Sequence, residues 1–397
     1  MFLDLPRDIH QRIADELYGY DRLKLSTCHS TLEEYGHLRE VYLDIADETS
    51  VDSFCLWLRK NRGTIRRLSV YDTTGVLGDN TLSEKFQRCL EISCTAVEDI
   101  SMNLRYHLPS ILSRLPSVKT AYFSDGGFPQ LPSLSRNEAL DTLCIRGGLE
   151  VTGDLMHASD LVGIAEAPKL RSLSIRGQDA RLCLCELPQL HHLTRLEIIG
   201  TRDTWNVVRD VHALPRLPHL KHVVLDSSSA LIDDLETDLG HLENIETLDV
   251  SRRHEKSPWN AYNNVLHKAS PTLIDFLGRM PHLKTLGAGD LILDHSAHSA
   301  SLETMHMSLL SFVASVGAAL TFDTFPKIQE LCIETATSLE LGMHVEEGFI
   351  RFLSRVPLKL RLRRGPGPAE GHAFENERLT VWFRIASYCP HLTIQIE

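Results

Sequence analysis

Ala-Pro-Lys-Leu-Arg-Ser-Leu-Ser-Ile, residues 167–175, contains the pattern that decides the fold. Leu170, Leu173 and Ile175 follow the spacing apolar-x-x-apolar-x-apolar, and Pro168 stands two residues before the first of them. The alternation of apolar and polar residues at the end of this stretch predicts a strand with one buried face. Proline disfavours helix, so Pro168 predicts that a preceding helix ends here and that an extended segment follows.

The same spacing recurs along the chain at intervals that average 29 residues. The first apolar residues of the eleven matches are Leu38, Ile65, Val97, Val118, Leu140, Leu170, Leu193, Leu220, Ile245, Leu283 and Ile328. Counting a twelfth at Leu392, six of the 17 prolines stand two residues before such a position. Three apolar positions match often by chance in a chain that is 43% apolar, so the prolines are the stronger sign of an internal repeat.

Amphipathic segments lie between the predicted strands and are expected to form helices that pack on them. They are residues 51–61, 82–93, 110–115, 231–242, 271–280, 345–356 and 376–388, and residues 355–364 and 392–396 are predicted as the last two strands. Stacked in register, such units give a solenoid with parallel strands on a concave face and helices outside. Residues 38–397 resemble leucine-rich repeats of the irregular, helix-containing kind. The predicted fold class is therefore an α/β leucine-rich-repeat solenoid, irregular after about residue 251.

Residues 1–36 precede the repeats and follow a different pattern. Leu5 and Pro6 open a predicted helix whose apolar residues recur every fourth position, and a second apolar pattern follows at residues 23–28. This short helical segment resembles an F-box, the module by which F-box proteins dock onto the Skp-family adaptor of a cullin–RING ubiquitin ligase. It departs from that family in being about one residue shorter before Cys28 and in ending on His-Ser-Thr-Leu at residues 29–32 in place of a basic-Trp sequence.

The resemblance implies two domains, an F-box-like segment at residues 1–36 and the repeats at residues 37–397. It implies a substrate-recognition subunit of a Skp–cullin–F-box ligase, in which the first domain binds the adaptor and the repeats bind a target protein. The expected adaptor contacts are Leu5, Pro6, Ile9, Leu23 and Leu25. The alternative is a non-catalytic interaction scaffold in which residues 1–36 only cap the open end of the solenoid.

Candidate partner-binding residues are aromatic and arginine side chains at positions where a strand points away from the core or where a loop follows a strand. On the strands they are Tyr42, Tyr71, Tyr122, Arg146 and Arg176, and in the loops they are Arg202, Trp205, Arg252, Arg253, Trp259 and Tyr262. The two strand arginines have a structural alternative, pairing with local carboxylates. Trp259 could equally fold back on its own helix.

Several function classes are disfavoured by the sequence. A net charge of −12 does not suit nucleic-acid binding, which needs clustered cations. No phosphate-binding glycine loop, Gly-x-Ser-x-Gly or His-Glu-x-x-His motif occurs, and the nine cysteines form no Cys-x-x-Cys pair, so no cofactor, metal or catalysis is expected. The longest uncharged stretch, residues 307–322, is shorter than the roughly 20 residues of a membrane helix. With a charged N-terminus that lacks an apolar run, the expectation is an intracellular protein, cytoplasmic or nuclear, without membrane attachment. An enzyme remains the third alternative and would need a pocket of convergent catalytic groups.

Overall fold

The structure is a computed structural model of the chain. It describes most of residues 40–147 and, beyond them, residues 160–177, 189–200, 217–225, 242–250, 277–289, 297–308, 324–335, 359–364 and 393–396, with shorter pieces between. The chain divides into two compact units, Met1–Gly177 and Gln178–Glu397. The predicted domain boundary at residues 36 and 37 and the whole F-box-like segment lie outside the described residues.

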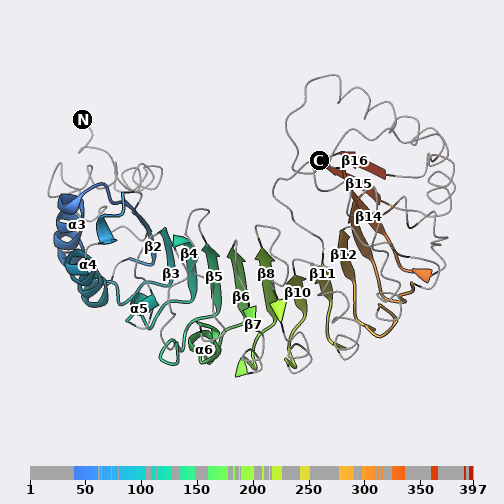
Figure 1. Cartoon of the computed structure of the whole chain (residues 1–397), viewed down its shortest axis with the longest axis horizontal. Helices are drawn as coiled ribbons and strands as arrows, with labels where there is room; N and C mark the ends of the chain where they lie inside the picture. Colours follow the sequence, from blue (N-terminus) through green and yellow to red (C-terminus); the bar gives the residue numbers. More distant parts are fainter. Residues whose placement is uncertain are drawn as a thin grey trace, which may run out of the picture. The chain divides into compact units, whose positions relative to one another are not determined.

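The first unit contains a parallel sheet whose described strands follow one another in chain order. They are β1 Glu40–Asp44, β2 Arg67–Tyr71, β3 Asp99–Asn103, β4 Thr120–Gly126, β5 Thr142–Gly147 and β6 Ser172–Gly177 (Figure 1). The repeated pattern stays in register across the sheet, since Leu68 pairs with Ile100 and Ile100 pairs with Ala121. These side chains are buried, so the second apolar position of each repeat forms a continuous row in the core.

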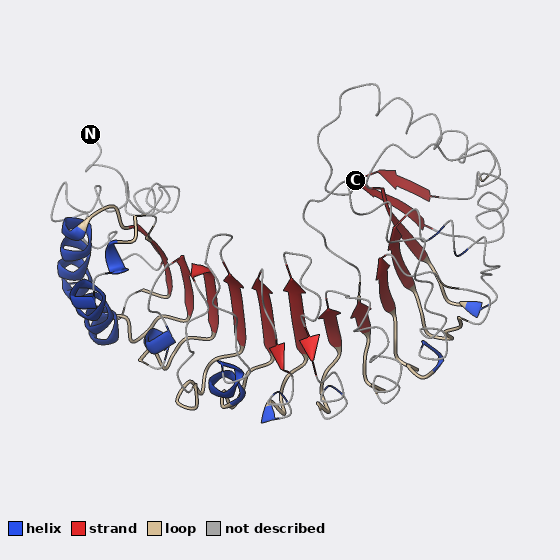
Figure 2. Ribbon diagram, in the orientation of Figure 1, coloured by secondary structure: helices blue, strands red, loops and turns tan. Residues whose placement is uncertain are grey.

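Helices follow the strands of the first unit. They are α3 Glu48–Lys60, the 3₁₀ turn η3 Val76–Gly78, α4 Asn80–Ser93, α5 Pro109–Leu112 and α6 Asp160–Ala165. The Asp47 carboxylate accepts a hydrogen bond from the Ser50 amide at 2.7 Å and so caps the start of α3. α3 and α4 lie side by side (Figure 2), with the ring centroids of Phe54 and Phe86 6.0 Å apart. Burial of a side chain such as Phe86 stabilises the fold by about 1.5–3 kcal/mol.

The second unit repeats this arrangement with shorter strands. They are β8 Arg195–Gly200, β10 His222–Leu225, β11 Thr247–Asp249, β12 Thr285–Gly289, β13 Thr304–Ser308, β14 Glu330–Thr335, β15 Lys359–Arg364 and β16 Thr393–Ile396, and each pairs in parallel with the next. A separate two-stranded parallel sheet joins β7 Leu182–Cys183 to β9 Val208–Arg209. Parallel strands stacked in chain order, with the apolar pattern in register, fit the predicted leucine-rich-repeat solenoid in both units.

Proline has a more specific role than the one predicted. Pro116, Pro218, Pro281 and Pro326 each occupy the second position of a four-residue turn that leads into a strand. In the turn around Pro281 the Leu283 amide donates to the Met280 carbonyl at 3.2 Å, and the Leu220 amide donates to the Leu217 carbonyl at 3.3 Å in the same way. The second position of a turn favours the φ angle that the proline ring enforces, so the four prolines fix the turns before these four strands.

The sequence pattern missed β13 and the two-residue strands β7 and β9, and it misaligned one repeat. β13 follows Leu302, which starts a further apolar-x-x-apolar-x-apolar match with Met305 and Met307 and divides the long gap before Ile328. The twelfth repeat does not start at Leu392, because Leu360 pairs with Ile394 and the matching first position is then residue 391. The pattern was placed one residue too late because Leu392, which directly follows residue 391, is the apolar residue of the pair. Three apolar positions alone do not fix the register of a strand.

The predicted helices meet different outcomes. Residues 51–61 and 82–93 are confirmed by α3 and α4, whereas residues 110–115 contain only the single turn α5. Residues 231–241, 271–276, 345–356 and 376–388 lie outside the described residues. No helix among the described residues is long and apolar enough to cross a membrane.

Candidate functional site

In the first unit, one face of the sheet carries the side chains that alternate with the buried positions of each strand. On this face lies one row of side chains, between the two buried positions of each strand: Tyr42, Ser69, Ser101, Tyr122, Cys144 and Ser174. We call this surface, on strands β1–β6, the outward strand face. Tyr42 is 63% exposed and the other five are half-buried.

A second row of the outward strand face lies two residues further along each strand. It consists of Asp44, Tyr71, Asn103, Ser124, Arg146 and Arg176. Arg146 and Arg176 are paired positions on β5 and β6, as the repeat spacing predicted, and Arg146 is exposed. The register thus brings two arginine positions side by side in an otherwise acidic chain.

Tyr42 and Tyr71 form an aromatic pair across the two rows. Their ring centroids are 4.7 Å apart and the ring planes meet at 24°, which is a stacked arrangement. The pKa of the Tyr42 hydroxyl is raised above its usual value by partial burial, and further by Tyr71 and the negative charge of Asp44. Tyr42 therefore stays neutral across the physiological range and offers a ring face and a hydrogen-bonding hydroxyl.

A third row, one position before the buried residues, consists of ion pairs that the sequence analysis did not find. Arg67 on β2 contacts Glu40 of β1 at 2.6 Å and Asp99 of β3 at 2.9 Å. Both carboxylates raise the pKa of the Arg67 guanidinium. The signal was present in the sequence, since opposite charges precede the second apolar residue in three successive repeats.

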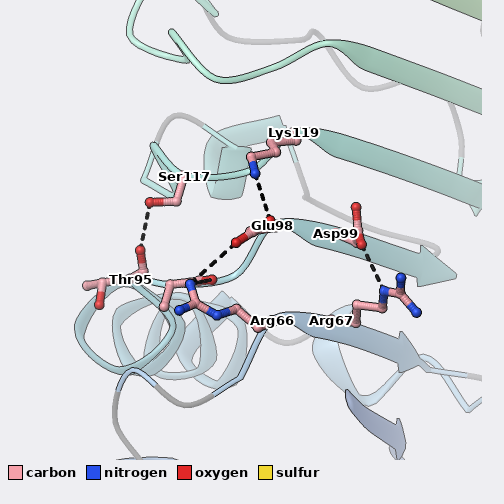
Figure 3. A network of polar contacts seen from close by, with 8 residues as sticks. Arg66, Arg67, Thr95, Glu98, Asp99, Ser117 and Lys119 are labelled. Carbon is pink, nitrogen blue, oxygen red and sulfur yellow. Dashed lines mark hydrogen bonds and ion pairs between the residues drawn. The ribbon is translucent and has the colours of Figure 1, made fainter. Parts of the chain in front are cut away.

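A neighbouring polar network lies where the strands begin (Figure 3). Glu98 accepts from Lys119 at 2.8 Å and contacts Arg66 at 3.4 Å, while the Ser117 hydroxyl donates to the Thr95 carbonyl at 2.8 Å. The Lys119 ammonium is the main reason that the pKa of Glu98 lies below its usual value. These contacts join successive repeats, so we assign them to solenoid stability rather than to binding.

The corresponding positions of the second unit are more enclosed. Glu197, Ile199 and Val224 alternate with the core positions of their strands, yet all three are buried. Alternation within one strand identifies the side that faces the helices, but it does not reveal whether neighbouring strands and loops cover the other side. Glu197 is compensated by Arg195 at 3.5 Å.

Several predicted site residues lie outside the described residues. They are the adaptor-binding set Leu5, Pro6, Ile9, Leu23 and Leu25 and the loop set Arg202, Trp205, Arg252, Arg253, Trp259 and Tyr262. Of the strand set, the structure brings Tyr42 and Tyr71 into contact and places Tyr122 in the row of Tyr42, three strands along.

Among the described residues, no group of three or more His, Cys, Asp or Glu side chains is arranged to hold a metal ion. On β10, the Nδ1 atom of His222 lies 3.1 Å from the Thr247 hydroxyl oxygen. Burial and the charge of Arg195 lower the pKa of His222, so it is neutral near pH 7.

Neither a protein-family model nor a curated protein matches the sequence. Among solved structures, an internalin C2 of Listeria monocytogenes aligns over 55% of this chain and 88% of its own, with 14% identity and a TM-score of 0.33. The functional domain of InlJ from Listeria monocytogenes, which includes a cysteine ladder, aligns over 84% and 71%, with 10% identity and a TM-score of 0.36. A Bacteroides fragilis protein aligns over 72% and 74%, with 12% identity and a TM-score of 0.36. The fold assignment rests on the strand register, and the F-box resemblance stays a prediction from the sequence.

Proposed function

We propose that the chain is a non-catalytic scaffold that binds a target protein on the outward strand face. The observation that carries this proposal is the stacked pair of the exposed Tyr42 and the half-buried Tyr71, in a surface that also holds Tyr122 and Arg146. Tyrosine and arginine supply most of the binding energy at protein interfaces, because each combines a large apolar area with hydrogen bonding. Ser69 and Ser101, which stand between Tyr42 and Tyr122 in the row, have short side chains. They leave room for a partner to lie across several strands.

The finer proposal is that the scaffold is the substrate-recognition subunit of a Skp–cullin–F-box ubiquitin ligase. Its support is the sequence of residues 1–36, placed directly before the repeats as in F-box proteins. In this proposal Leu5, Pro6, Ile9, Leu23 and Leu25 bind the adaptor while the repeats hold the target. The chain then acts by raising the effective concentration of the target near the ubiquitin-loaded enzyme, without bond chemistry of its own.

Binding of the purified full-length chain to a Skp-family adaptor tests the finer proposal. We expect wild type to bind, and the double variant Leu5→Asp/Ile9→Asp to lose binding while its circular dichroism spectrum stays unchanged. The matched control is Leu56→Asp/Ile92→Asp, which places the same charges on two apolar side chains exposed on α3 and α4. Absence of binding by a folded wild-type chain would contradict the ligase role and leave residues 1–36 as a cap on a protein-binding scaffold.

A further inference from the structure

Tyr42 is unusual among the apolar side chains of the described strands because its ring is open to solvent. It is 63% exposed, although it stands in a sheet whose buried positions are filled by aliphatic residues. Tyr71 stacks on it with the ring centroids 4.7 Å apart. A ring fixed in this way loses little conformational freedom on binding and presents a π-surface of defined orientation.

Asp44 lies beside this aromatic pair. It stands two residues after Tyr42 on the same face of β1, and its Cα partner on β2 is Tyr71. Asp44 is exposed, and its carboxylate makes no hydrogen bond or ion pair with any other described residue. Its charge reaches Tyr42, whose pKa it helps to raise.

The neighbouring charged side chains of the sheet are engaged in ion pairs with one another. Glu40, on the same face of β1, contacts Arg67, and Arg67 also contacts Asp99. Among the described residues around the stacked tyrosines, Asp44 is therefore the carboxylate without an ion pair, within a chain of net charge −12. A cationic group is the complement of this position.

We infer that Tyr42, Tyr71 and Asp44 form a receptor for an arginine side chain of the bound target protein. This inference rests on the proposed protein-binding function and names the chemistry of the contact. A guanidinium stacks flat on a tyrosine ring and directs its N–H groups to a carboxylate at the ring edge. A lysine ammonium is not planar, so it cannot stack flat on the tyrosine ring while it donates a forked pair of hydrogen bonds to the carboxylate.

The test uses the full chain with [13C]tyrosine labelling and three probe peptides, acetyl-Ser-Gly-X-Gly-Ser-amide with X as arginine, lysine or citrulline. The Tyr42 ring resonance is assigned from its loss in Tyr42→Leu. We expect the arginine peptide to shift this resonance in a saturable way, the lysine peptide to bind at least threefold more weakly, and the citrulline peptide to cause no shift. Asp44→Asn should weaken arginine binding at least threefold. Glu84→Gln removes the same charge from the exposed surface of α4 and should leave binding unchanged.

Three results would overturn the inference: no shift at Tyr42, equal binding of the arginine and lysine peptides, or an equal loss in Asp44→Asn and Glu84→Gln. The last two would indicate general attraction to an acidic protein. The peptide experiment and the test of protein binding can fail independently of each other. A chain that binds a protein through the outward strand face but ignores the arginine peptide contradicts only this inference. A chain that binds the peptide but captures no protein on that face contradicts only the scaffold.

Discussion

The carboxylate of Asp249 on β11 occupies the space that a Cβ atom would take on Gly287 of β12. The two residues are paired positions in the parallel sheet of the second unit. The neighbouring strand therefore explains the glycine at position 287, because the missing side chain leaves room for the Asp249 carboxylate. An ordinary strand residue at this position would compete with Asp249 for the same volume.

Gly287→Ala should accordingly destabilise the chain, because the added methyl group forces the Asp249 carboxylate aside. We expect a loss of about 1–3 kcal/mol in the free energy of unfolding, the usual cost of overpacking. Urea denaturation of Gly287→Ala, Asp249→Ala and the double variant forms a double-mutant cycle. If the cost of Gly287→Ala is the same with and without Asp249, the contact between the two residues is not its cause.

The turn before β11 lacks the proline that the turn before β10 contains. The Ile245 amide donates to the Leu242 carbonyl at 3.4 Å, which places Glu243 where Pro218 stands in the preceding repeat. Glu243→Pro should raise the free energy of unfolding by about 0.4–1 kcal/mol, because proline restricts the unfolded chain at a compatible position. Pro218→Ala is the reciprocal variant and should lower it by a similar amount. Thermal unfolding measures both, and a destabilised Glu243→Pro would contradict the assigned turn.

Asp72 organises the loop between β2 and α4. Its buried carboxylate accepts hydrogen bonds from the amides of Gly75 at 2.8 Å, Val76 at 3.0 Å and Leu77 at 2.8 Å. Asp72→Ala leaves these donors without their acceptor and should cost about 1–3 kcal/mol in denaturant unfolding. Asp47→Ala, which removes the exposed cap of α3, should cost only about 1 kcal/mol. Equal costs for the two variants would mean that the Asp72 bonds are replaced by water.

The network of Glu98 predicts a pH dependence of stability. Because hydrogen bonding and charge from Lys119 lower the pKa of Glu98, its contribution is complete above the unfolded-state value, about 4.5, and is lost as the pH falls through the lower folded-state value. The difference in unfolding free energy between wild type and Glu98→Gln should therefore shrink between pH 7 and pH 3. A difference that is constant over this range would show that the charge of Glu98 has no part in it.

The strands were predictable because their signal is local and repeated. Leu170, Leu173 and Ile175 carry it in one repeat, and the same spacing locates every predicted strand of the first unit. The strand at Met305 was missed because it lacks a preceding proline and lies beside a long uncharged stretch.

The candidate site was predictable only in part. Tyr42, Tyr71 and Tyr122 were found because alternation identifies which side chains leave the core. The stacking of Tyr42 on Tyr71 depends on the register between two strands. That Asp44 forms no ion pair with another described residue depends on which neighbouring charges pair with one another. Likewise, the burial of Glu197 and Val224 depends on groups from outside their own strands.

Photo-crosslinking from the outward strand face tests most directly whether this surface binds a protein. Benzoylphenylalanine is placed at Ser69 or Asn103 on the strands, and at Arg88 on the exposed surface of α4 as the control, in the full chain expressed in its native cells. We expect the strand positions to crosslink one and the same protein, the yield to fall at least threefold with Tyr122→Ala, and Arg88 to give no such product. Crosslinking of that protein from Arg88 but from neither strand position would place the interface on the helices and contradict the account.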